Sequence, residues 1–165
     1  MKIPVLHLED GLHHFEGLLK GRSLQFYRQE LYPRDISVGV DVDKYENTLR
    51  CSIQVDTIAR YTCDRCLNEF DHTVHTVFQL LFHVGKDTWK TSEEEVIHLP
   101  VETVDVDLTP WIVESLILDV PMKMLCKEEC LGICPQCGVN RNEEPCQCDT
   151  TRIDPRWEKL RDLLK

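Results

Sequence analysis

The sequence predicts an α+β fold in which an antiparallel β-sheet is covered by a helix and followed by a cysteine-rich module and a terminal helix. Apolar and polar residues alternate in residues 36–43 and again in residues 49–56, and this period of two is typical of half-buried strands. A mainly apolar segment over residues 108–120, with prolines near both ends, predicts the helix. We expect a sheet domain over residues 1–125 and a cysteine-rich module over residues 126–165.

The two alternating segments are separated by a polar turn that contains Asn47, as in a β-hairpin. A third strand is expected over residues 70–84, where apolar side chains again fall on one face. Three amphipathic strands in succession predict an antiparallel sheet with one face covered.

The N-terminal residues are less regular. Residues 3–8 are compatible with an edge strand, whereas residues 12–24 fit either a short helix or an irregular loop, because Gly17 and Gly21 weaken a helix. Residues 96–99 are expected to form a short strand that Pro100 ends.

The predicted helix has clear boundary signals. Thr109 is a good N-cap, Pro110 suits the first helical position, and Pro121 ends the helix. Because most of its other residues are apolar, we expect it to pack against the sheet. A last helix is expected to begin at Asp154 as N-cap, with Pro155 in its first turn.

Composition limits the classes of function. The chain has 165 residues, 42% of them hydrophobic, and a formal net charge of −10, so broad charge-driven binding of nucleic acid is disfavoured. RNA contact would require a local patch, such as the basic residues of 152–165, or a protein partner. There is no apolar run long enough to span a membrane and no signal peptide, so we expect a cytoplasmic protein.

An acidic segment lies between Glu93 and Asp107 and contains no lysine or arginine. It is interpreted either as a solvated loop and turn or as a docking surface for a basic partner.

Nine cysteines carry most of the chemical information: Cys51, Cys63, Cys66, Cys126, Cys130, Cys134, Cys137, Cys146 and Cys148. In a reducing compartment, closely spaced pairs favour metal binding over disulfides. Zinc binds four cysteines in a tetrahedron, and two cysteines a few residues apart can hold one ion from a tight turn.

The spacing predicts two structural Zn²⁺ ions, each held by four thiolates. Cys134, Cys137, Cys146 and Cys148 form a complete local zinc knuckle, in which Gly138 permits the positive φ of the turn. Cys63, Cys66, Cys126 and Cys130 form the second set. A closed set leaves no position for water or substrate, so both sites are expected to be structural, with a zinc-thiolate redox sensor or regulator as the alternative.

The remaining candidate residues point away from catalysis. Cys51 lies on the apolar face of its strand and is expected to be a buried hydrophobe, and His72 is either a core histidine or a donor to a metal-bound sulfur. No catalytic triad, phosphate loop or carboxylate pair is present, so an enzyme with a small-molecule substrate is not supported.

Short motifs resemble the bacterial YceD family, the large ribosomal RNA subunit accumulation proteins. They are YTCDRC (61–66), VPMKMLC (120–126), GICPQCGVN (132–140), CQC (146–148) and DPRW (154–157). Met124 replaces a common proline and Arg141 a common leucine. The resemblance implies a non-enzymatic factor that supports accumulation, processing or assembly of 23S ribosomal RNA. Its partner would be a large-subunit precursor, contacted through 23S rRNA, a ribosomal protein, or both.

Overall fold

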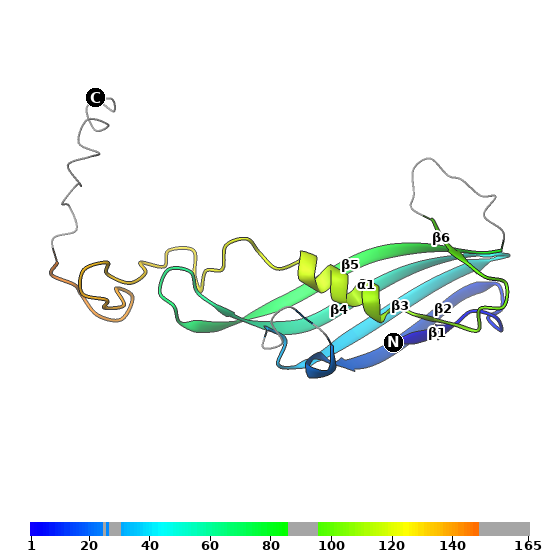
Figure 1. Cartoon of the computed structure of the whole chain (residues 1–165), viewed down its shortest axis with the longest axis horizontal. Coiled ribbons are helices and arrows are strands. Elements are labelled where there is room, and N and C mark those ends of the chain that lie inside the picture. The colour runs from blue at the N-terminus through cyan, green and yellow to red at the C-terminus, as the bar shows by residue number, and fades with distance from the viewer. Residues whose placement is uncertain (25, 27–30, 86–95, 149–165) are drawn as a thin grey trace, which may run out of the picture. The chain divides into compact units, whose positions relative to one another are not determined.

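The computed structural model describes residues 1–24, 26, 31–85 and 96–148 (Figure 1). Contacts divide the chain into two compact units, one formed by residues 1–61 and 71–122 and the other by residues 62–70 and 123–165. The predicted terminal helix, the basic residues near it and Glu93–Glu95 lie outside the described residues. The second unit thus combines the turn at 62–70 with the cysteine-rich segment, whereas the sequence-based boundary at residues 125 and 126 stays a prediction.

A five-stranded sheet dominates the first unit, with the strand order β2-β3-β4-β5-β6. Its strands are β2 (Gly11–Lys20), β3 (Asp35–Tyr45), β4 (Thr48–Thr62), β5 (Glu69–Val84) and β6 (Val96–Leu99). The fold is therefore α+β: it contains an antiparallel sheet and, among the described residues, the α-helix described below (Figure 1).

The predicted hairpin is confirmed by β3 and β4, which pair in antiparallel register with Val42 opposite Cys51 and Val40 opposite Ile53. The inward-facing side chains of both strands are 0–1% exposed. They are Ile36, Val38, Val40, Val42, Leu49, Cys51, Ile53 and Val55. Burial of these apolar side chains is the main stabilising term of the sheet.

The predicted short strand at residues 96–99 forms as β6, and it joins the edge of the sheet by running parallel to β5. Val96 pairs with Leu81 and Leu99 pairs with Val84, so β6 meets only the last residues of β5. The parallel pairing is therefore confined to Leu81–Val84 of β5.

Residues 12–24 form neither a helix nor an irregular loop over most of their length. β2 pairs with β3 from Gly11 to Lys20, and a short 3-10 helix follows at Gly21–Ser23. A side chain at Gly17 would meet Met1 Sδ at 3.1 Å, so this glycine leaves room for Met1 against the strand. Pairing with β3 from Gly11 to Lys20 thus determines the structure of this segment, although its glycines give it a low intrinsic strand propensity.

The N-terminal strand forms, but it is shorter than expected and belongs to another sheet. β1 (Lys2–Pro4) pairs antiparallel with β7 (Asp105–Asp107) in a two-stranded sheet. Ile3 and Val106 face each other in this pair and are 0% and 5% exposed, respectively. The N-terminal residues are therefore held in place by burial as well as by backbone pairing.

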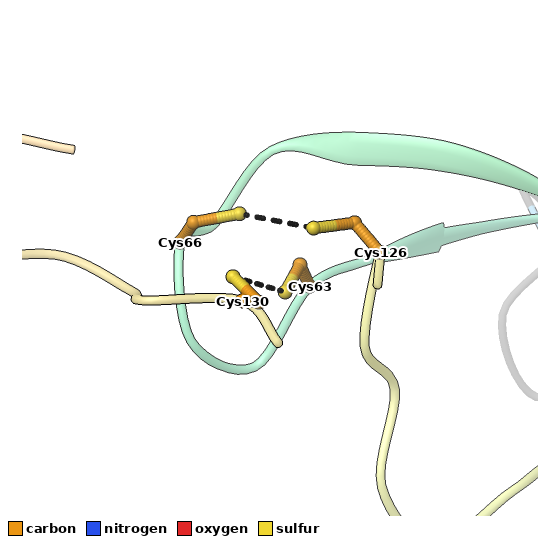
Figure 2. Close-up of side chains that lie close together, drawn as sticks. All are labelled: Cys63, Cys66, Cys126 and Cys130. Atoms are coloured by element: carbon orange, nitrogen blue, oxygen red, sulfur yellow. Dashed lines mark hydrogen bonds between the residues drawn. The ribbon is translucent and has the colours of Figure 1, made fainter. Parts of the chain in front are cut away.

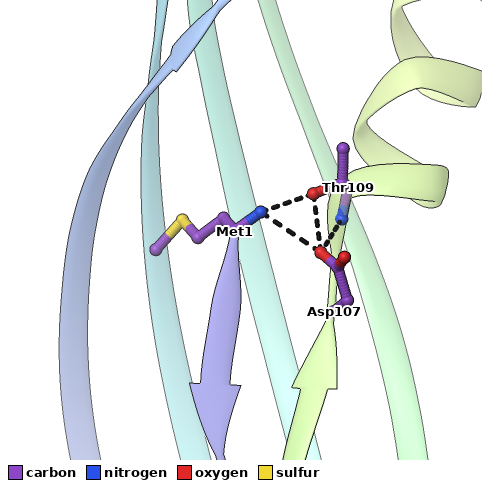
Figure 3. Close-up of polar contacts among 3 residues, drawn as sticks. All are labelled: Met1, Asp107 and Thr109. Atoms are coloured by element: carbon purple, nitrogen blue, oxygen red, sulfur yellow. Dashed lines mark hydrogen bonds and ion pairs between the residues drawn. The ribbon is translucent and has the colours of Figure 1, made fainter. Parts of the chain in front are cut away.

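The helix α1 spans Thr109–Leu118, and Leu108 rather than Thr109 is its N-cap. Figure 3 shows the reason: the Asp107 carboxylate accepts hydrogen bonds from the backbone N–H and the hydroxyl of Thr109, at 3.0 and 2.6 Å. The α-amino group of Met1 lies 3.2 Å from the same carboxylate.

Two residues of α1, Ile112 and Leu116, are fully buried. The Trp111 ring meets the Phe82 ring of β5 edge to face, with centroids 5.6 Å apart. The Tyr32 hydroxyl donates a 2.8 Å hydrogen bond to the Leu116 carbonyl. Among the described residues, no helix is long and apolar enough to cross a membrane.

Candidate metal centres

The second unit brings eight cysteines together as two sets of four. One set contains Cys63, Cys66, Cys126 and Cys130, and the other contains Cys134, Cys137, Cys146 and Cys148. Within each set, all sulfur atoms lie within 4.8 Å of one another. These are the two sets that the spacing predicts. At the first site, Cys66 and Cys126 meet although they are 60 residues apart in the chain (Figure 2).

The first site is built on the turn between β4 and β5. The Leu67 N–H donates to the Cys63 carbonyl, and the Cys63 N–H donates to the Asn68 carbonyl, each at 2.9 Å. Leu67 closes this turn with a φ of 62°, in the left-handed region that few leucines occupy.

The second site repeats the same backbone pattern. The Gly138 N–H donates to the Cys134 carbonyl at 2.9 Å, and the Cys134 N–H donates to the Val139 carbonyl at 2.8 Å. Gly138 has a φ of 75°, so it holds the position that Leu67 holds in the first turn. Both turns therefore present their two thiols in the manner of a zinc knuckle.

The residues between Cys63 and Cys66 tie the first turn to the segment that carries the other two thiols. The Asp64 carboxylate accepts a 2.7 Å hydrogen bond from the Met124 N–H, and the Asp64 N–H donates to the Met124 carbonyl. The Arg65 guanidinium donates to the Cys130 carbonyl at 2.9 Å and to the Glu128 carbonyl at 3.3 Å. Met124 acts through its backbone, and its N–H is a donor that a proline at this position could not supply.

The sulfur distances fit a tetrahedral metal ion. Cys63 and Cys130 are 3.8 Å apart and Cys66 and Cys126 are 3.6 Å apart, measured between Sγ atoms (Figure 2). In the second set, Cys137 and Cys146 are 3.5 Å apart. A zinc ion with bonds of about 2.3 Å to four sulfurs holds them about 3.8 Å apart, whereas a disulfide requires about 2.05 Å.

The acidities of the thiols also favour a cation. Burial raises the pKa of Cys63, but backbone N–H groups outweigh burial and lower this pKa to about 6. Backbone N–H groups lower the pKa of Cys134 to about 6 as well. Burial raises the pKa of Cys126 to about 12, and hydrogen bonds to neighbouring thiols raise that of Cys148 to about 12. Each set therefore has one thiol that ionises readily and another that needs a positive charge nearby to ionise.

The two sites differ in exposure. Cys63, Cys66 and Cys130 are at most 4% exposed and pack with Phe70 and Leu125, whereas Cys137 is exposed to solvent. The second site is therefore the more exposed of the two.

A supporting residue that sequence reasoning missed is Asn142. Its amide Nδ2 donates to Cys130 Sγ at 3.3 Å, and its Oδ1 accepts from the Leu131 N–H at 2.9 Å. Its place in the short loop between Cys137 and Cys146 puts it close to the cysteines in sequence, but nothing in that loop indicates that it contacts the sulfur of Cys130.

Two other candidates are placed elsewhere. Cys51 is fully buried on the inner face of β4, where burial raises the pKa of its thiol to about 12, so its predicted role as a buried hydrophobe is confirmed. His72 is exposed, and its ring lies 5.8 Å from the Tyr61 ring, so the prediction of a core histidine is wrong. His72 lies on the same face of β5 as the buried Val74, but near the start of the strand, where Asp71 and Thr73 on the opposite face are exposed as well.

The fold and the two thiol sets define an α+β protein with two cysteine clusters that could hold metal ions. The chain belongs to the YceD family, because the family model "Large ribosomal RNA subunit accumulation protein YceD" matches residues 51–164. This confirms the resemblance found in the motifs.

Known proteins with similar sequences come from bacteria and plants. An uncharacterised protein of Mycobacterium tuberculosis is 32% identical over 140 residues, which cover 82% of this chain and 67% of the relative. The Arabidopsis thaliana protein "Large ribosomal RNA subunit accumulation protein YCED homolog 1, chloroplastic" is 24% identical over 154 residues, covering 78% of this chain and 48% of the relative. The Bacillus subtilis protein YlbN is 29% identical over 106 residues, covering 62% of this chain and 59% of the relative. No solved structure matches.

Proposed function

We propose that this chain is a non-enzymatic ribosome-biogenesis factor that supports accumulation and processing of 23S rRNA and assembly of the large ribosomal subunit in the cytoplasm. The observation that carries the proposal is membership of a family named for accumulation of large ribosomal RNA. The plant relative carries the same name, which supports extending it to this chain.

The proposal includes two structural Zn²⁺ ions, one in each four-thiol set. Zinc is favoured over harder divalent ions because every available ligand is sulfur. A set of four thiolates occupies all positions of a tetrahedral ion, which supports a structural rather than a catalytic metal. X-ray absorption at the zinc edge should find only sulfur neighbours, and oxygen or nitrogen neighbours would count against this assignment.

The same proposal includes packing of α1 on the apolar face of the sheet, so that the helix covers this face. Its support is the burial of Ile112 and Leu116 and the ring contact between Trp111 and Phe82. A single layer of strands needs such a cover because its inward side chains would otherwise face water.

The direct partner is a large-subunit precursor, contacted through 23S rRNA, a ribosomal protein, or both. A net charge of −10 favours a basic protein surface as the first contact, since electrostatic complementarity speeds such an encounter. Phosphate contacts would have to be local.

The test is sedimentation of the tagged chain from a gentle lysate on a sucrose gradient, combined with depletion of the chain. We expect the chain to migrate with large-subunit precursors, and we expect depletion to lower the ratio of 23S to 16S rRNA. In depleted cells, the Cys137→Ser variant should neither migrate with large-subunit precursors nor restore the ratio of 23S to 16S rRNA. Cys51→Ala, which changes a cysteine outside the thiol sets, should do both. Protein that stays at the top of the gradient, with an unchanged rRNA ratio on depletion, would overturn the proposal.

A second candidate, a zinc-thiolate redox sensor, has one specific observation in its favour: the exposed thiol of Cys137. The two functions separate on peroxide treatment followed by a zinc-release assay. A sensor would release zinc from the second site at micromolar peroxide and change its sedimentation, whereas a structural site should retain its metal.

A further inference from the structure

β2 forms a free edge of the five-stranded sheet. It is the first strand in the sheet order and pairs along its whole length with β3 on one side only. From Gly11 to Leu19, the described backbone hydrogen bonds of β2 outside the strand itself are those of its ladder with β3. Natural edge strands are usually short or carry lysine, proline or a bulge in their interior, because an open edge pairs readily with another strand. β2 has none of these before Lys20.

The solvent-facing side chains of β2 follow a symmetric order. Leu12, His14, Glu16 and Leu18 are exposed, while the residues between them are partly buried. Leu12 is 82% exposed and Leu18 is 72% exposed, which is unusual for two leucines on one strand. Two apolar side chains therefore flank one basic and one acidic side chain.

This order is complementary to itself when a second copy of β2 runs antiparallel to the first. With Phe15 opposite Phe15 of the partner subunit, Leu12 faces the partner's Leu18, and His14 faces the partner's Glu16. Both contacts occur twice because the pairing has twofold symmetry. Opposed apolar residues and opposite charges are the cross-strand pairs that stabilise sheets.

Other registers lose this complementarity. A shift by one residue would place an exposed side chain opposite a partly buried one, which the pleat does not allow. A shift by two in one direction places His14 opposite its own copy, and in the other direction Glu16 opposite its own copy. Like charges would then meet at the symmetry axis, where they repel.

We infer that β2 is a dimerisation edge, at which two copies of this chain pair as antiparallel strands and join their sheets into one continuous sheet. This interface lies in the first unit and does not depend on the proposed ribosomal function or on the metal sites.

Light scattering and sedimentation equilibrium of the metal-loaded full chain, from micromolar to millimolar concentration, test the inference. We expect a transition from the 19.3 kDa monomer to twice that mass. Hydrogen exchange should slow at amides of residues 11–20 as the dimer forms, and remain unchanged in β4, which is already paired on both sides.

Charge exchange tests the register. Glu16→Lys places a cation opposite His14, and His14→Glu places an acid opposite Glu16, so each single variant should raise the dimer dissociation constant at least tenfold. The double variant H14E/E16K restores opposite charges across the interface and should recover most of the affinity. Because His14 Nε2 also lies 3.2 Å from Glu16 Oε1 of its own chain, denaturant unfolding of each variant at monomer concentration separates a folding effect from an interface effect. Glu102→Lys makes the same charge change at an exposed site away from β2 and serves as the control.

The leucines provide an independent comparison. Leu18→Lys should weaken the dimer, whereas Val77→Lys, at a 56% exposed site on β5 and away from β2, should not. A chain that stays monomeric at millimolar concentration overturns the inference. A dimer whose β2 amides are not protected, or whose affinity ignores both charge exchange and Leu18→Lys, also overturns it.

Discussion

Leu67 and Gly138 hold equivalent positions in the two cysteine turns, and both have a positive φ, 62° and 75°. A side chain in the left-handed region costs about 1 kcal/mol relative to glycine. Leu67 is 61% exposed, so its side chain gains little burial in return. We therefore expect Leu67→Gly to raise the free energy of unfolding of the metal-loaded second unit by about 1 kcal/mol.

The reciprocal change provides the control. Gly138→Leu should lower the same free energy by about 1 kcal/mol, although no atom lies near enough to clash with a new Cβ there. Denaturant titration followed by hydrogen exchange of residues 123–148 measures both variants. If Leu67→Gly destabilises the turn, then the leucine side chain contributes a contact that outweighs its backbone strain.

Cys51 should behave unlike the other eight cysteines. Because its thiol is fully buried among apolar side chains, Cys51→Ser places a hydroxyl there without a partner and should cost about 1–3 kcal/mol of stability. The zinc content should stay unchanged, as measured by atomic emission on the purified chain. Cys63→Ser should instead lose about one equivalent of metal, and equal metal loss in both variants would contradict the assignment of Cys51.

The sequence indicates the cysteine pairs well because each pair lies on one local turn. The two cysteines and the residues between them determine the geometry of that turn. Asn142 and Arg65 are harder to predict. Their partners are the sulfur of Cys130 and the carbonyls of Cys130 and Glu128, and no spacing rule links those atoms to an amide or a guanidinium elsewhere in the chain.

At the scale of elements, the predictions succeed where burial produces a clear period. The alternation in β3 and β4 is strict because one face is fully buried, and α1 has proline signals near both ends. β2 breaks the pattern because two of its leucines face solvent, which removes the alternation that marks a strand. The direction of β6 depends on its pairing with β5, which local sequence does not encode.

The junction between β7 and α1 should make the first unit sensitive to acid. Hydrogen bonds from the Thr109 hydroxyl and N–H, assisted by the Met1 amine, lower the pKa of Asp107 to about 2. A lowered carboxyl pKa contributes stability that is complete above the unfolded value near 4 and is lost as the pH falls toward 2. Because half of this side chain is exposed, we expect a contribution of about 1 kcal/mol.

The measurement uses the fluorescence of Trp111 in a chain whose other tryptophans are phenylalanine, so that the signal reports the first unit. Unfolding by denaturant at several pH values between 6 and 2 should show this loss in the parent chain. Asp107→Asn should be less stable at pH 6 and should lose less stability on acidification. Parallel pH profiles for the two chains would mean that Asp107 is not the group responsible.

At the scale of the whole molecule, charge and metal act together. The formal charge of −10 counts the cysteines as neutral, so eight thiolates that hold two divalent ions would make the chain more acidic still. Such a molecule is repelled by RNA phosphates at long range and attracted to basic protein surfaces. For the function proposed above, the sign of the charge therefore favours a ribosomal protein as the first contact and leaves any RNA contact to a short-range patch.

Removal of metal should unfold the second unit and leave the first unit folded. Within residues 62–70 and 123–148, the second unit has few buried apolar side chains besides its cysteines, so the folding energy of this part would come largely from the metal. The first unit instead has an extensive apolar core on β3 and β4. A chelator should therefore abolish hydrogen-exchange protection in residues 123–148 and leave that of residues 36–56 nearly unchanged. Added zinc should restore protection, while magnesium, which prefers oxygen ligands, should not. Loss of protection in both ranges on chelation would mean that the sheet depends on the metal sites for its stability.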